Sequence, residues 1–137
     1  MLSHNRRKVI TMCKATEYLK ELDVLVNNIN KEFNILSKKQ SEYDTKLSEY
    51  YHQIENANFN ACEGYKLTKQ LQQLLRKRRI VKDELFRLNS LRQTLNIVAM
   101  NNSIIKSKKN IEKSKKHSDQ YKKNWKYTYT FEEVVYG

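Results

Sequence analysis

The chain of 137 residues is 39% hydrophobic and 31% charged, and it contains two Gly and no Pro. Because Gly and Pro mark most turns and strand ends, their scarcity argues against a strand-rich fold and favours one mainly α-helical domain with a narrow apolar seam. The formal net charge of +12 at pH 7 favours a polyanion or an acidic protein surface as the partner.

The positive charge lies in the second half of the chain. Residues 1–60 carry a net charge of +1, residues 61–100 carry +6 and residues 101–137 carry +5. No apolar run approaches the roughly 18 residues of a membrane-spanning helix. The N-terminus lacks the apolar block of a signal peptide, so we expect a cytoplasmic protein.

The first predicted element is a helix over residues 12–55, because its apolar residues recur in alternating steps of three and four. This stripe consists of Met12, Ala15, Leu19, Leu22, Val26, Ile29, Phe33, Leu36, Tyr43, Leu47, Tyr50 and Ile54. Gln40 is its polar interruption. A sustained heptad stripe is typical of a coiled-coil helix, here about 65 Å long.

A second helix is predicted over residues 61–100. Asn60 and Glu63 have the spacing of a helix N-cap and its capping-box partner. The apolar stripe of this helix consists of Leu67, Leu71, Leu74, Val81, Leu85, Leu88 and Leu95. Because a short link forces two long helices to run antiparallel, residues 1–100 are predicted to form a long antiparallel helical hairpin, a coiled coil.

The register of this hairpin follows from folding the chain about residue 58 or 59. It sets Gln40 opposite Arg78, so that the two form a register-setting polar layer in the seam. It also sets Val26 opposite Arg92, whose guanidinium we expect to reach outward to water.

The basic run "RKRR" (residues 76–79) lies within the second helix. Its four side chains point in different directions, so they cannot form one flat patch. A candidate ridge on the outer face would bind phosphates or an acidic partner; it consists of Lys69, Arg76, Arg79 and Arg87. The alternative is a solvated helix flank whose charge is partly muted by neighbouring carboxylates.

Residues 101–124 form a lysine-rich segment that we expect to be a third helix or a flexible arm. Ser103 could cap such a helix, with Ile104 and Ile111 as its thin apolar stripe. The lysines are further candidates for sequence-independent phosphate contacts; they are Lys106, Lys108, Lys109, Lys113, Lys115, Lys116, Lys122 and Lys123.

Residues 125–136 are predicted to form a short C-terminal β-strand. Their aromatic residues alternate with polar ones; these are Trp125, Tyr127, Tyr129 and Phe131. A single strand needs a partner, which could be Lys8–Thr11, a second copy of the chain or a sheet edge on another protein. The aromatic rings could instead stack on single-stranded bases.

Residues for catalysis or metal binding are not grouped in the sequence. Cys13 and Cys62 would lie about 70 Å apart along the first helix, whereas a disulfide allows about 7 Å between Cα atoms, so we expect both to be reduced. No Cys/His cluster has zinc spacing, and no Gly-rich phosphate loop or nucleophile elbow occurs. We therefore expect a protein that is not an enzyme and that holds no metal or cofactor.

Residues 58–88 contain an Arg-Arg-x-x-Lys-Asp-Glu motif formed by Arg78, Arg79, Lys82, Asp83 and Glu84. This stretch resembles small helical-hairpin proteins of phages of low-GC Gram-positive bacteria. The resemblance implies a phage or mobile-element accessory protein, located in the host cytoplasm, that binds and inhibits a host or defence protein.

Three functions are consistent with these features. The first is a non-enzymatic binding protein that modulates a host or defence nucleic-acid-handling protein or nucleoprotein through its basic helical face and C-terminal strand. The second is direct, sequence-independent binding of DNA or RNA. The third is a structural role in which two hairpins form a homodimeric four-helix bundle.

Overall fold

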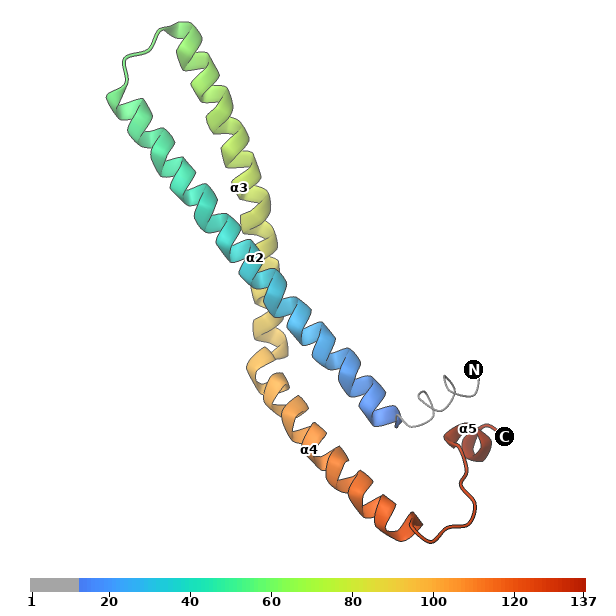
Figure 1. Ribbon diagram of the computed structural model, residues 1–137. Helices are drawn as coiled ribbons and strands as arrows, with labels where there is room; N and C mark the ends of the chain where they lie inside the picture. Colours follow the sequence, from blue (N-terminus) through green and yellow to red (C-terminus); the bar gives the residue numbers. More distant parts are fainter. Residues whose placement is uncertain (1–12) are drawn as a thin grey trace. The chain divides into compact units, whose positions relative to one another are not determined.

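The structure is a computed structural model that describes residues 13–137. In this range the chain forms α2 (Lys14–Asn56), α3 (Ala61–Leu95), α4 (Ile97–Lys122) and the short α5 (Phe131–Val135), and it forms no strand (Figure 1). The helices belong to two compact units. One unit is Asn27–Asn96. In the other, the described residues 13–26 pack with Ile97–Gly137.

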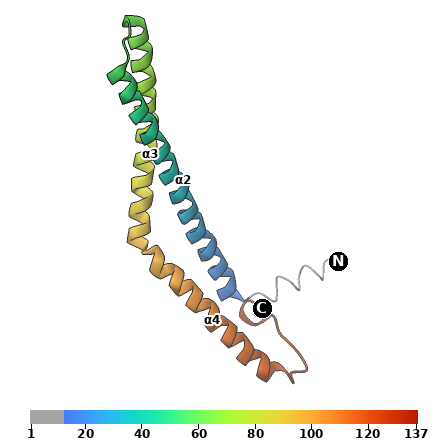
Figure 2. The ribbon, with the colours of Figure 1, turned by 60° about the vertical axis from the view of Figure 1, so that its left-hand side comes forward.

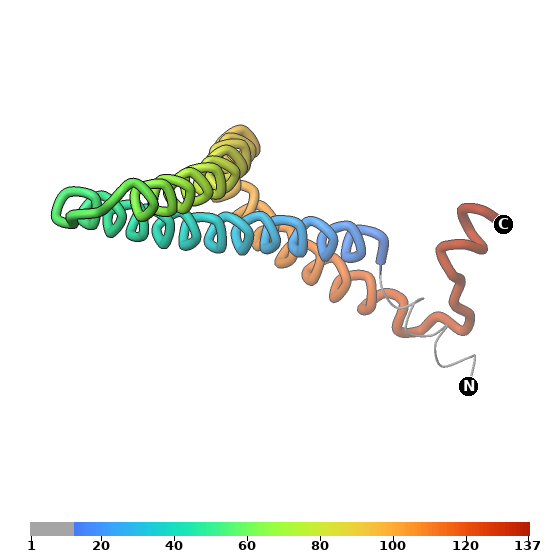
Figure 3. The backbone as a smooth tube through the Cα atoms, turned by 90° about the horizontal axis from the view of Figure 1, so that it is seen from above, coloured from blue at the N-terminus to red at the C-terminus, as the bar shows by residue number. Residues whose placement is uncertain are grey.

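The unit Asn27–Asn96 is a helical hairpin. Residues 27–56 of α2 and the whole of α3 run antiparallel, and the two helices are joined by the short link 57–60 (Figures 2 and 3). Ile29, Leu67 and Leu74 are buried between them. Most other positions of the two predicted stripes within this unit are half-buried, although Ile54 and Leu95 are exposed. Ala15 and Leu22, which the first stripe also included, are exposed. The predicted hairpin is therefore present.

The start of α3 is fixed by local interactions. The predicted N-cap is confirmed, because the Asn60 side chain accepts a hydrogen bond from the Glu63 backbone N–H at 2.9 Å. The Phe59 ring lies against Gly64, with ring carbons 3.2 and 3.3 Å from the place of a Cβ. This contact joins the residue before the cap to the fourth helical residue, as in a hydrophobic staple, and a bare glycine leaves room for the ring.

Two arginines of the seam have partners that the sequence did not predict. Arg78 donates from Nε to Asp44 Oδ1 at 2.6 Å, one turn nearer the link than Gln40. The Arg92 guanidinium lies 3.9 Å from the centroid of the Phe33 ring, so the expectation that it reaches outward to water is wrong. A guanidinium is weakly hydrated and stacks well on an aromatic face. This contact offsets part of the cost of burying the Arg92 Nε, which has no hydrogen-bond partner among the described residues.

The third helix begins earlier than predicted, and the second ends earlier. Asn96 has a left-handed backbone (φ 50°) and its N–H bonds to the carbonyls of Arg92 and Gln93. Asn tolerates this conformation better than most residues, so α3 ends at Leu95 instead of residue 100. Ser103 consequently lies inside α4 instead of capping it.

In the second unit, α4 packs antiparallel along residues 14–26 of α2. Leu19 and Val26 from α2 and Ile97 and Ile104 from α4 are buried. Lys108 Nζ lies 3.2 Å from Asp23 Oδ2. The lysine-rich segment is therefore an ordered helix with an apolar side.

The predicted β-strand over residues 125–136 is wrong. Thr130 caps α5 through a capping box, in which Thr130 Oγ1 accepts the Glu133 N–H at 3.2 Å and Glu133 Oε2 accepts the Thr130 N–H at 3.4 Å. This local Thr-x-x-Glu signal forms a helix without any partner, whereas a strand needs one. The predicted partner Lys8–Thr11 lies outside the described residues.

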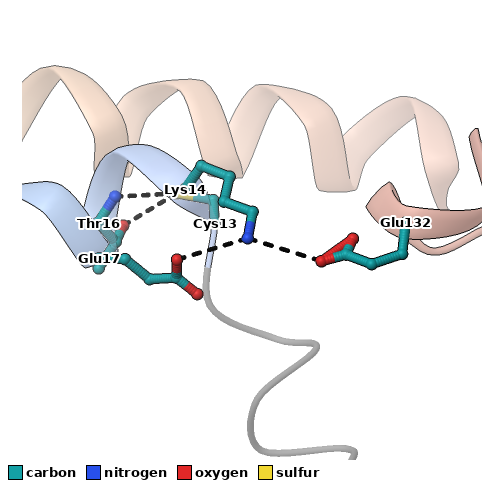
Figure 4. A network of polar contacts seen from close by, with 5 residues as sticks. All are labelled: Cys13, Lys14, Thr16, Glu17 and Glu132. Carbon is teal, nitrogen blue, oxygen red and sulfur yellow. Dashed lines mark hydrogen bonds and ion pairs between the residues drawn. The ribbon is translucent and has the colours of Figure 1, made fainter. Parts of the chain in front are cut away.

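The short α5 contacts the start of α2. Lys14 Nζ lies 3.7 Å from Glu17 Oε2 and 3.6 Å from Glu132 Oε1 (Figure 4). The same ammonium lies 5.3 Å from the centroid of the Phe131 ring. Glu17, followed by Glu132, raises the pKa of Lys14 above its ordinary value.

Candidate nucleic-acid interface

Charge is divided unequally among the helices. α2 has six basic and eight acidic residues, giving −2, whereas α3 has nine and three, giving +6, and α4 has seven and two, giving +5. Carboxylates of α2 pair with one cation of each basic helix, as Asp44 does with Arg78 and Asp23 with Lys108. The cations on the outer faces have few carboxylates left to neutralise them.

Four lysines line one face of α4. Lys106, Lys109, Lys113 and Lys116 follow one another in steps of three, four and three residues, so they lie within about 80° of arc on the side away from the buried isoleucines. Each is exposed, and none forms an ion pair with any described residue. We call this set the lysine face; it is about 15 Å long.

The other predicted lysines of this region are differently engaged. Lys108 is paired with Asp23, and Lys115 Nζ lies 3.7 Å from Glu112 Oε1. Lys122 Nζ lies 5.7 Å from the centroid of the Trp125 ring, and Lys123 occupies the turn after α4. The eight predicted lysines therefore do not act as one set, since four of them are aligned and unpaired.

An aromatic row continues the lysine face toward the end of α4. His117 and Tyr121 make an edge contact with ring centroids 5.5 Å apart, and Tyr121 and Trp125 are tilted at 6.5 Å. Tyr121 and Trp125 remain 60% and 51% exposed. Lys113 lies four residues before His117 on α4, so the aromatic row follows directly on from the lysine face.

The four aromatic residues predicted to share one strand face do not lie together. The Trp125 ring belongs to the aromatic row, and the Trp125 backbone N–H donates to the Lys122 backbone carbonyl at 2.9 Å. Phe131 is the first residue of α5, and the centroid of its ring lies 5.9 Å from that of Tyr136. Tyr127 and Tyr129 are exposed and make no ring contact with described residues. The sequence prediction missed Tyr121, because period-two alternation does not link this residue at the end of α4 to Trp125 just beyond the helix.

The predicted ridge on α3 lies on the outer face of the hairpin. Lys69, Arg76 and Arg79 are exposed and form no ion pair with the described residues, but Arg87 Nη1 lies 3.1 Å from Glu84 Oε1. Exposed Ile80 and Phe86 lie next to these cations along the helix. The α3 ridge therefore mixes positive and apolar side chains, unlike the lysine face of α4.

The Cys13 thiol at the start of α2 is another polar group with a distinct environment. Its Sγ lies 2.9 Å from Thr16 Oγ1 and accepts the Thr16 N–H at 3.4 Å (Figure 4). These two bonds, with a smaller contribution from Lys115, lower the pKa of Cys13. The thiol borders an open pocket of about 440 Å³ that Ile111, Lys115 and other α4 residues line. Cys62 is a free, exposed thiol as well.

Comparison with known proteins adds no assignment. No protein-family model matches the chain, and no curated protein or solved structure is significantly similar to it. Within residues 13–137, no helix has the length and apolar character needed to span a bilayer. The same range holds no group of three or more His, Cys, Asp or Glu residues arranged to bind a metal ion.

Proposed function

We propose that this protein is a non-enzymatic, sequence-independent nucleic-acid-binding protein that contacts phosphates through the lysine face of α4. The observation that carries the proposal is the alignment of Lys106, Lys109, Lys113 and Lys116 on one helix face without a single carboxylate partner among the described residues. Lysine ammonium groups bind phosphates as point charges and read no base sequence.

The proposal predicts a strong dependence of affinity on salt. Each neutralised phosphate contributes about −0.7 to the slope of log K against log salt for single strands and about −0.9 for duplex DNA. Changing the four lysines to Gln should therefore reduce the slope by roughly 3. Fluorescence anisotropy of a labelled oligonucleotide, measured over a salt series, provides both affinity and slope.

A matched variant separates the lysine face from net charge. Lys20, Lys31, Lys38 and Lys66 are also exposed and unpaired among the described residues, so their fourfold change to Gln lowers the net charge equally. This control should retain most of the affinity and slope. Equal losses in both variants, or no binding at about 20 mM salt where phosphate contacts are strongest, would refute the proposal.

A protein partner is the second candidate, and the α3 ridge favours it. Arg and aromatic side chains are enriched in the central parts of protein interfaces, and exposed Phe86 lies about two turns beyond Arg79 on the same side of this helix. The partner would be an acidic surface of a host or defence nucleic-acid-handling protein. The C-terminal strand no longer supports this candidate, since residues 125–136 form no strand.

Affinity capture with and without nuclease distinguishes the two candidates. A partner that is retained after nuclease treatment and lost with Phe86→Ala and Arg79→Gln would favour the protein candidate. Loss of all captured material on nuclease treatment would favour nucleic acid.

A further inference from the structure

We propose that Tyr121 and Trp125 form a stacking platform for bases, so that the nucleic acid bound along α4 is single-stranded. This inference rests on the proposed function and names the class of ligand that the lysine face receives. It begins from the position of the aromatic row, which follows the lysine face at the C-terminal end of α4.

The two aromatic rings have no role in the apolar core. The buried side of α4 is formed by Ile97 and Ile104, and helical spacing directs Tyr121 away from that side. The aromatic and cation–π contacts of Tyr121 and Trp125 are with each other, His117 and Lys122. Rings that remain more than half exposed after folding retain apolar surface on which another planar group can stack.

The order of residues along α4 matches the two kinds of contact that a single strand requires. A strand that follows the helix would meet the lysine face first and then the aromatic row. Within this row Tyr121 lies about 6 Å beyond His117 along α4, and Trp125 follows just after the helix ends. Lys122, Lys123 and Lys126 surround Trp125 in the sequence and supply cations for the backbone at that end. Proteins that bind single strands without sequence preference combine a positive track with aromatic stacking in this way.

The preference for a single strand over a duplex follows from whether the faces of the bases are accessible. In a duplex both faces of each internal base are already stacked, and only the edges are accessible in the grooves. The exposed indole of Trp125 and the exposed phenol of Tyr121 would therefore gain contacts with an unpaired base that they cannot gain with a paired one. Lys122 contributes by holding the indole through its cation–π contact.

The only tryptophan of the chain provides a direct probe of this platform. Because the chain has one Trp, fluorescence excited at a wavelength where tyrosine absorbs little reports on Trp125 alone. Titration of the full-length protein with a 12-nucleotide oligo(dT) should quench this fluorescence by stacking, whereas a 12-base-pair duplex should quench it little. Tyr121→Ala and Trp125→Ala should each weaken single-strand binding by about 5- to 150-fold, measured by anisotropy.

Two controls make the test specific. Tyr65→Ala removes an exposed tyrosine of α3 and should leave the affinity unchanged, and Trp125→Phe should recover most of the loss because it restores a π face. Far-UV circular dichroism should show unchanged helicity in every variant.

The possible outcomes separate this inference from the proposed function. Salt-dependent binding without fluorescence quenching, or with equal affinity for duplex and single strand, would overturn the stacking platform and leave the proposed function standing. Binding of poly-glutamate with the same affinity and quenching would overturn the platform as well, because the surface would then recognise charge alone. Failure of any nucleic acid to bind at low salt would overturn both.

Discussion

Replacing Asp44 by Asn removes the carboxylate that binds Arg78 and tests the register of the hairpin. The Arg78 side chain is 23% exposed and that of Asp44 is 48% exposed, with Nε and Oδ1 2.6 Å apart. Charged hydrogen bonds are stronger than neutral ones, but the exposure of Asp44 means that water competes for the carboxylate. We therefore expect a coupling free energy near the upper end of that for surface pairs, about 0.5–1 kcal/mol.

A double-mutant cycle isolates this coupling free energy, because the effects of the two single substitutions are subtracted from that of the double variant. The single variants Asp44→Asn and Arg78→Gln and the double variant are unfolded with urea, and helicity is followed by circular dichroism. The coupling should decrease with added salt, because exposed charges are screened. A parallel cycle with Gln40→Ala and Arg78→Gln should give a coupling near zero.

The two cycles distinguish the observed contact from the one predicted from sequence. Measurable coupling between Gln40 and Arg78, with none between Asp44 and Arg78, would show that the helices pair in the predicted register. Our assignment of the polar contact in the seam would then be wrong.

Three further substitutions test local features. Asn60→Ala should lower the free energy of unfolding by about 1 kcal/mol, because α3 loses its N-cap; urea denaturation measures this loss. Because the pKa of Cys13 is lowered chiefly by Thr16, Thr16→Val should move the pH profile of iodoacetamide alkylation to higher pH, measured in a Cys62→Ser background. Phe131→Ala should release α5 and increase amide hydrogen exchange in the last residues, measured by mass spectrometry.

Each of these tests has a result that contradicts the structure. An Asn60→Ala variant as stable as the parent would mean that the cap contributes nothing. An unchanged alkylation profile in Thr16→Val would show that the hydroxyl does not stabilise the thiolate. Exchange that is already complete in the parent protein would show that α5 is not held against α2.

The distribution of charge among the helices explains why the basic outer faces of α3 and α4 are not neutralised within the chain. The acidic α2 supplies carboxylates to seam cations such as Arg78 and Lys108. Cations on the outer faces lie beyond the reach of these carboxylates. Their mutual repulsion is moderate at physiological salt, and a polyanion that binds there would relieve it.

The sequence by itself determined the two helices of the hairpin and the start of α3. Heptad spacing places apolar residues on one face, and Asn60 and Glu63 mark a helix start, because both signals act between residues three or four positions apart. The Thr130-x-x-Glu133 signal of α5 is equally local. The alternation of aromatic residues predicted a strand instead, which would have needed a partner strand.

Only the tertiary structure decided which side chains meet. The choice of Asp44 over Gln40 by Arg78, and the packing of Arg92 on Phe33, depend on where long, flexible side chains find partners across the seam. The separation of the lysines into paired and unpaired sets also depended on Asp23 and on the side that α4 turns toward α2. Periodicity fixes the direction of a side chain around its own helix, whereas a polar partner is chosen by distances of a few ångströms between helices, which no local pattern encodes.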